Sequence, residues 1–75
     1  MRNALIHYAT VEGRFFTVPT IVKTNLETGK TLVDCRTAKG GSAGWRVVRT
    51  IIGAANTPRH FCFVNGTLAS VEYAP

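Results

Sequence analysis

The stretch Ser42-Ala-Gly-Trp-Arg-Val-Val-Arg-Thr-Ile-Ile-Gly-Ala-Ala55 decides the fold that this sequence predicts. At the helical period of about 3.6 residues, its apolar side chains fall in one stripe, formed by Trp45, Val48, Ile52 and Ala55. Arg46 and Arg49 fall on the opposite side, and their spacing places them on one helix face. The pattern predicts an amphipathic helix over 42–55, with Ser42 as N-cap and the apolar stripe packed on a sheet.

A strand is the alternative for the same residues, because their β-branched side chains favour extended backbone. The adjacent pairs Val47-Val48 and Ile51-Ile52 break the alternation that is typical of a half-buried strand, and this favours the helix. Pro58 and the residue before it disfavour helical continuation, so the helix ends before them.

The segments on either side of this stretch have the composition of strands. Residues 5–11 and 14–22 flank Glu12-Gly13, which fits a two-residue hairpin turn, and residues 31–36 follow as a third strand. Residues 61–64 and 67–73 flank Asn65-Gly66, a pair that accepts the positive φ angles of a type I′ turn. The predicted order is β-β-β-α-β-β. This is an α+β fold with a small antiparallel sheet and one packed helix, in a single domain over 1–75.

The chain has 75 residues and a formal net charge of +5, from nine Lys and Arg against four Asp and Glu. A chain of this length supports one hydrophobic core. Its positive charge favours an anionic partner, which can be nucleic acid, acidic protein or anionic lipid. Neither a secretory leader nor an apolar run long enough to cross a bilayer is recognisable, so we expect a cytoplasmic protein without a membrane partner. In that compartment Cys35 and Cys62 stay reduced, as small buried side chains.

Residues able to support catalysis or hold a cofactor are scarce. His7 and His60 lie in no recognisable catalytic motif, and few acids are available to orient them, so we expect no enzyme. His60 and Cys62 point to one side of a strand, where Cys35 or His7 could complete a zinc site, but the close cysteine pairs typical of structural zinc are absent. The loop over 39–44 lacks the spacing of a phosphate-binding loop. We predict neither a metal nor a cofactor.

Basic residues gather in and beside the predicted loop and helix. The set consists of Arg36, Lys39, Arg46, Arg49 and Arg59. No acid within the helix offsets its two arginines, so these five residues form the candidate partner-binding surface, with an ordinary solvated helix face as the alternative. Most cations of the chain are arginines, which suit bidentate contact with carboxylate or phosphate.

The segment Tyr8-Ala-Thr-Val-Glu12, followed by Phe16-Thr-Val-Pro19 and by Thr24, resembles the first hairpin of the small RNA polymerase inhibitor made by short-tailed lytic phages. That inhibitor also packs a helix against a small sheet. Its helix follows the first hairpin directly and is acidic, whereas here a third strand intervenes and the predicted helix is basic. Its polymerase-contacting residues are therefore not transferred to this chain. The size and element order also resemble phage proteins that disable host machinery, including anti-CRISPR proteins.

These resemblances imply a non-enzymatic phage-type protein in the cytoplasm of the host cell. It would bind and inhibit a large nucleic-acid-handling complex, RNA polymerase or a CRISPR effector, whose acidic side chains would meet the basic surface. The alternative is a small DNA- or RNA-binding module in which the same residues contact phosphates. A third hypothesis is a homo-oligomer that uses an unpaired sheet edge. The oligomeric state is left open.

Overall fold

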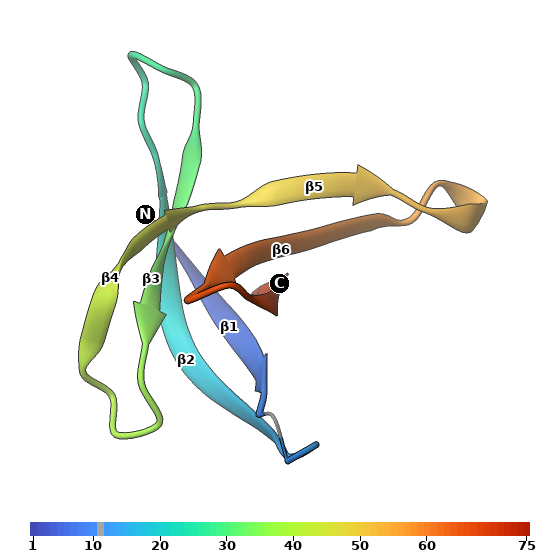
Figure 1. Ribbon diagram of the computed structural model, residues 1–75. Coiled ribbons are helices and arrows are strands. Elements are labelled where there is room, and N and C mark those ends of the chain that lie inside the picture. Colours follow the sequence, from blue (N-terminus) through green and yellow to red (C-terminus); the bar gives the residue numbers. More distant parts are fainter. Residues whose placement is uncertain (11) are drawn as a thin grey trace.

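The computed structural model describes residues 1–10 and 12–75, and its regular structure is almost entirely β-strand (Figure 1). Its strands are β1 (Arg2–Ala9), β2 (Phe15–Thr24), β3 (Thr31–Arg36), β4 (Ser42–Val47), β5 (Arg49–Ile52), β6 (Pro58–Val64) and β7 (Thr67–Tyr73). They form one antiparallel sheet in the order β4-β3-β2-β1-β7-β6-β5. A single 3-10 turn, η1 (Ala54–Asn56), lies between β5 and β6.

The sheet curls into a half-barrel because its two outermost strands belong to one continuous segment. β4 pairs with β3, and after Val48 the same segment pairs with β6 as β5. At the change of partner, the Val48 N–H still donates to the Thr31 carbonyl on β3, at 2.8 Å. Figure 1 shows β4 and β5 as one bent ribbon that runs from the β3 side of the sheet to the β6 side.

The concave face of the curled sheet holds the core. Its buried apolar side chains are Ala4, Ile6, Val18, Val22, Val33, Cys35, Cys62, Ala69 and Val71. Ile6 is fully buried at the centre, directly opposite Val18 on β2 and Val71 on β7. Most of these side chains are small or β-branched, so the opposing walls of the half-barrel can approach closely and still interdigitate.

The predicted α+β fold is wrong, because residues 42–55 form β4, β5 and part of η1 instead of a helix. The predicted apolar stripe does not exist, since Trp45 and Val48 lie on opposite faces of an extended chain. Ser42 caps nothing. Its hydroxyl donates to the buried carboxylate of Asp34, with 2.6 Å between Oγ and Oδ1.

The failure of the helix prediction has a physical cause in the bent strand. Each of its faces carries apolar and polar side chains, so Val47 is partly exposed on the convex side while Val48 packs against the core. Adjacent apolar residues are expected of such a strand and do not argue for a helical period. The β-branched side chains then favour extended backbone, and the strands just before and just after the segment, β3 and β6, supply its hydrogen bonds.

The predicted hairpins are present, with one change of register. Asn65 and Gly66 have φ angles of 51° and 77°, as a type I′ turn requires, and they join β6 to β7. In the first hairpin the Thr10 N–H donates to the Arg14 carbonyl, so the turn is one residue longer than the predicted Glu12-Gly13 turn. The end of the predicted first strand, Val11, lies outside the described residues.

Candidate docking surface

The whole net charge of the protein originates from residues 36–59. The cations of this segment are Arg36, Lys39, Arg46, Arg49 and Arg59, and no acid occurs between positions 35 and 71. The four remaining cations are matched by four acids elsewhere in the chain, so the five cations of the segment equal the formal charge of +5. The segment begins at the end of β3, includes β4, β5 and η1, and reaches into β6.

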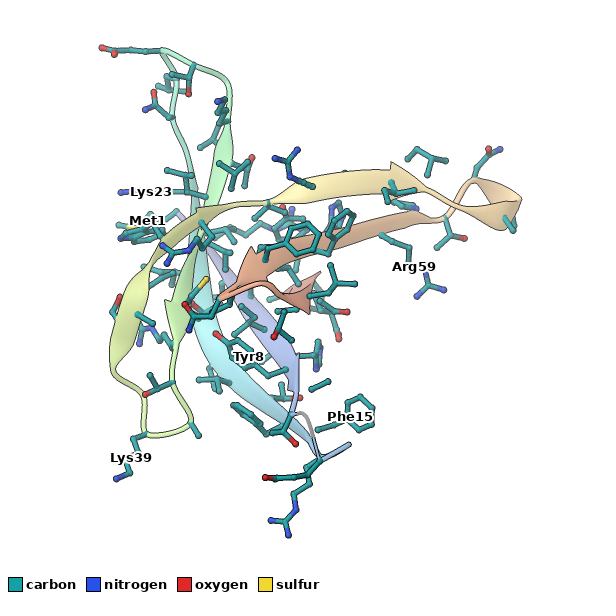
Figure 2. The ribbon with its side chains drawn as sticks, in the orientation of Figure 1. Met1, Tyr8, Phe15, Lys23, Lys39 and Arg59 are labelled. Atoms are coloured by element: carbon teal, nitrogen blue, oxygen red, sulfur yellow. The ribbon has the colours of Figure 1, made fainter. Side chains whose placement is uncertain are left out.

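Three of the five predicted residues belong to the β3–β4 hairpin and do not join the other two on one surface. Arg36 pairs with Asp34, with 3.0 Å between Nε and Oδ2, which neutralises much of its charge. Lys39 lies at the tip of the β3–β4 hairpin, far from Arg59 in Figure 2. Arg46 lies opposite Val33 and therefore points to the concave side of the sheet. A shared helix face for Arg46 and Arg49 is excluded, because three residues along a strand reverse the side of the sheet.

Arg49 and Arg59, in contrast, lie together on a two-stranded arm. We use the name arm for residues 49–59, all of which are exposed and which extend away from the rest of the sheet in Figure 1. Arg49 is opposite Phe61, and Ile51 is opposite Arg59. Directly opposed residues share a face of the sheet, so the arginines and apolar side chains form a checkered pattern on the convex side.

The apolar part of this surface continues from the arm onto β6 and β7. We use the name docking face for Arg49, Ile51, Arg59, Phe61, Phe63 and Leu68, which share the convex side by strand register. The fractional exposures of Ile51, Phe63 and Leu68 are 56%, 51% and 53%, and the rings of Phe61 and Phe63 meet edge to face at 5.9 Å. Large apolar side chains that gather in water at this density are typical of an interaction surface.

The sequence analysis named Arg49 and Arg59 as candidates but none of the apolar residues of the docking face. Phe61 and Phe63 alternate with His60, Cys62 and Val64 along β6, so both faces of the strand look apolar in the sequence. The burial of Cys62 in the core decides which face is turned outward. Leu68 is opposite Phe63 and therefore also points to the convex side of the sheet.

A hydrogen-bonded chain of three polar side chains lies on the same convex side. His7 Nδ1 is 2.7 Å from Thr17 Oγ1, and His7 Nε2 is 3.0 Å from Glu72 Oε1. An acid therefore does reach His7, which the sequence gave little reason to expect. Thr17 and Glu72 are exposed, so their interactions occur at high dielectric, where charges on a reacting group receive little stabilisation.

A groove opens where the arm leaves the body, between the first residues of β6 and the last residues of β7. His7, Arg59, Glu72 and Tyr73 are among the residues that line it. The His60 ring packs at a tilt against Tyr73, with 4.6 Å between ring centroids, and its Nδ1 is 2.9 Å from Thr50 Oγ1. These contacts of His60 hold β5 and β7 against β6 at the point where the arm joins the sheet.

The two cysteines are free and fully buried, which confirms the prediction of small buried side chains. Burial raises the pKa of Cys35 and raises that of Cys62 to about 12, so both thiols stay neutral. His60 shares the concave side with Cys62, whereas His7 lies on the convex side. Among residues 1–10 and 12–75, no group of three or more potential metal ligands comes together.

Within the described part of the chain, no helix has the length and apolar character needed to cross a membrane. Comparison of the chain with protein-family models, with curated proteins and with solved structures gives no match.

Proposed function

We propose that this protein is a non-enzymatic binding protein that docks on an acidic surface of a partner protein through its docking face. The observation that supports this proposal is the position of Arg49 and Arg59 among exposed apolar side chains. Neither arginine forms an ion pair with any residue in the described ranges. Both guanidinium groups are therefore available to carboxylates of a partner.

The composition of the docking face favours protein over nucleic acid as the partner. Aromatic residues and arginine are the types enriched at the energetically important centres of protein interfaces. Nucleic acid would gain little from Ile51 and Leu68, because phosphate contacts need cations and base stacking needs aromatic side chains. Two arginines flanked by apolar surface match a partner that presents carboxylates around an apolar centre.

The finer part of the proposal concerns the partner and the compartment. The resemblance of the first hairpin to a phage inhibitor makes a large nucleic-acid-handling complex of a bacterial host, RNA polymerase or a CRISPR effector, the first partner to test. Blocking such a complex requires occupancy of a site and no chemistry, which agrees with the exposure of Thr17 and Glu72, the two partners of His7. A reducing cytoplasm would keep the two buried thiols free.

Charge reversal tests the proposal. The double variant Arg49→Glu with Arg59→Glu should reduce retention of partner proteins from a nuclease-treated bacterial lysate by at least about tenfold, because like charges across an interface cost several kcal/mol. The matched control is Arg14→Glu with Lys30→Glu, which makes the same change of net charge at two exposed turn positions outside the docking face. Equal retention by both double variants would refute the choice of surface.

A salt titration separates the protein partner from the nucleic-acid alternative. Binding to generic DNA or RNA that weakens steeply and linearly in a log–log plot against salt indicates phosphate contacts. If such binding is lost in the Arg49→Glu, Arg59→Glu variant and no lysate protein is retained by the wild type, the nucleic-acid module replaces our proposal.

A further inference from the structure

The β5 strand has one paired edge and one free edge. It is the last strand of the sheet, and among residues 1–10 and 12–75 it pairs with β6 only. The Gly53 N–H donates to the Thr57 carbonyl at 3.0 Å, and hydrogen-bonded pairs alternate along an antiparallel ladder. The backbone groups of Arg49 and Ile51 therefore face β6, whereas those of Thr50 and Ile52 face away from it.

The Val48 hydrogen bond confirms this direction. Val48 has the same parity as Thr50 and Ile52, and its N–H points to the Thr31 carbonyl of β3, on the side opposite β6. β3 begins at Thr31, so the ladder on this side stops where β5 starts. The N–H and C=O groups of Thr50 and Ile52 thus continue an existing sheet edge, and no strand of the described part of the chain lies beside them.

Natural sheets commonly protect such edges with proline, a bulge or an inward-pointing charge. β5 is short and begins with the charged Arg49, but it has no proline or bulge along its free side, and its other three residues are β-branched types that favour strand pairing. All four are exposed. The edge has the properties of a surface that accepts an added strand.

The positive charge of the arm favours an acidic segment over a second copy of the chain at this edge. A second copy of the chain would bring β5 against β5 and place arginines of both arms near one another, with no acid between positions 35 and 71 to compensate them. A segment with an acidic residue opposite Arg49 meets no such repulsion. An apolar residue two positions away would lie on the same face and cover Ile51.

We propose that β5 binds an extended acidic–apolar segment of the partner protein by strand addition, with the backbone of Thr50 and Ile52 forming the new ladder. This inference rests on the proposed function and specifies how the partner is held. Main-chain hydrogen bonds give the affinity, and the alternation of acidic and apolar side chains gives the selectivity.

The first experiment measures amide hydrogen exchange by NMR with a synthetic probe, acetyl-Thr-Glu-Thr-Val-Thr-Glu-Thr-Val-amide. In the free protein the Thr50 and Ile52 amides should exchange quickly, and saturating probe should slow both by at least about tenfold, as expected for newly hydrogen-bonded strand residues. The same peptide with lysine in place of glutamate is the charge control and should leave both rates unchanged. Absence of binding by the glutamate peptide, or binding that leaves both amides unprotected, would overturn strand addition.

The second experiment removes one edge donor. Ile52→Pro deletes an N–H that faces away from β6, so the β5–β6 ladder should survive, as proline at an exposed edge allows. Ile52→Ala is the matched control, because it also loses the isoleucine side chain but keeps the N–H. We expect the probe to bind Ile52→Pro about fivefold more weakly than Ile52→Ala, the usual net effect of one hydrogen bond. Equal affinity would contradict the inference.

A third experiment changes the probe instead of the protein, so its result does not depend on how proline affects the arm. N-methylation of the two central residues of the probe, one at a time, should abolish binding at the position whose N–H faces β5 and spare it at the other. Equal effects at the two positions would refute a ladder. If charge reversal at Arg49 and Arg59 abolishes capture of a lysate partner while the edge tests fail, the proposed function stands and strand addition does not.

Discussion

Gly44→Ala distinguishes the observed strand from the helix that the sequence predicts, because the two structures give opposite signs. Gly44 lies inside β4 with a φ angle of +103°, a region that side chains with a Cβ rarely adopt. In the first turn of the predicted helix, replacement of this glycine by alanine would stabilise the protein, by up to about 1 kcal/mol. In this fold the same change must lower the free energy of unfolding.

The magnitude follows from three terms. Backbone strain at such a φ angle costs about 1–3 kcal/mol, and the reduced freedom of the unfolded chain offsets about 0.4–1 kcal/mol of it. The new Cβ would lie 3.1 Å from Arg46 Nη1, which can move because Arg46 is exposed, so the steric term is small. The net loss is about 1–2 kcal/mol, and for a domain of this size Tm should fall by about 4–16 °C.

Thermal unfolding followed by circular dichroism measures this effect, and Gly53→Ala is the control. Gly53 belongs to the same predicted helix but has a φ angle of −90°, and a Cβ there would meet only the Thr57 carbonyl at 3.6 Å, an ordinary contact. Its Tm should change little or rise slightly. An unchanged or raised Tm for Gly44→Ala would refute the strand assignment of β4.

The other predictions concern the core, its polar edge and alkaline pH. Ile6→Ala should lower the free energy of unfolding, measured in urea, by about 2–5 kcal/mol, because Ile6 is fully buried. Leu68→Ala, at an exposed position, should lower it by well under half as much. Comparable losses in the two variants would refute the assignment of the core face. Asp34→Ala removes the acceptor of hydrogen bonds from Ser42 and Arg36 and should cost about 2 kcal/mol in the same assay; a neutral result would show that these bonds add nothing. Burial raises the pKa of Tyr8 and that of Cys62 to about 12, above their unfolded values of 10.0 and 9.0. The unfolded state then releases protons first, so urea midpoints should fall steadily from pH 9 to 12, less steeply in Tyr8→Phe; identical slopes would contradict the tyrosine contribution.

The strands on either side of residues 42–55 could be predicted because their signals are local. Asn65-Gly66 fixes a type I′ turn through its own φ angles, and residues 31–36 form β3 with the predicted bounds. The register of the first hairpin could not be predicted in the same way. The turn is one residue longer than a two-residue loop, and this moves Tyr8 opposite Phe16, onto the same face.

The helix prediction failed because residues 42–52 change strand partner in the middle of the segment. β4 pairs with β3, the strand before it, and β5 pairs with β6, the strand after it, so one bent segment belongs to two hairpins. A 3.6-residue stripe and an extended segment with apolar residues on both faces give the same pattern at Val47-Val48 and Ile51-Ile52. Propensity was the better guide here, because five of the six residues from 47 to 52 are β-branched, and four of these are Val or Ile.

The candidate surface depends on the same bent strand, and this makes its tests interpretable. Residues 49–59 are all exposed and contribute no side chain to the buried core. The position of the arm therefore depends on β4 and β6, which connect its two ends to the rest of the sheet. Charge changes at Arg49 and Arg59 remove no buried contact and break no ion pair of the described structure. Their effect on unfolding should therefore be small, whereas their effect on a carboxylate-bearing partner should be large. Loss of binding without loss of Tm would thus report on the surface itself rather than on the fold that carries it.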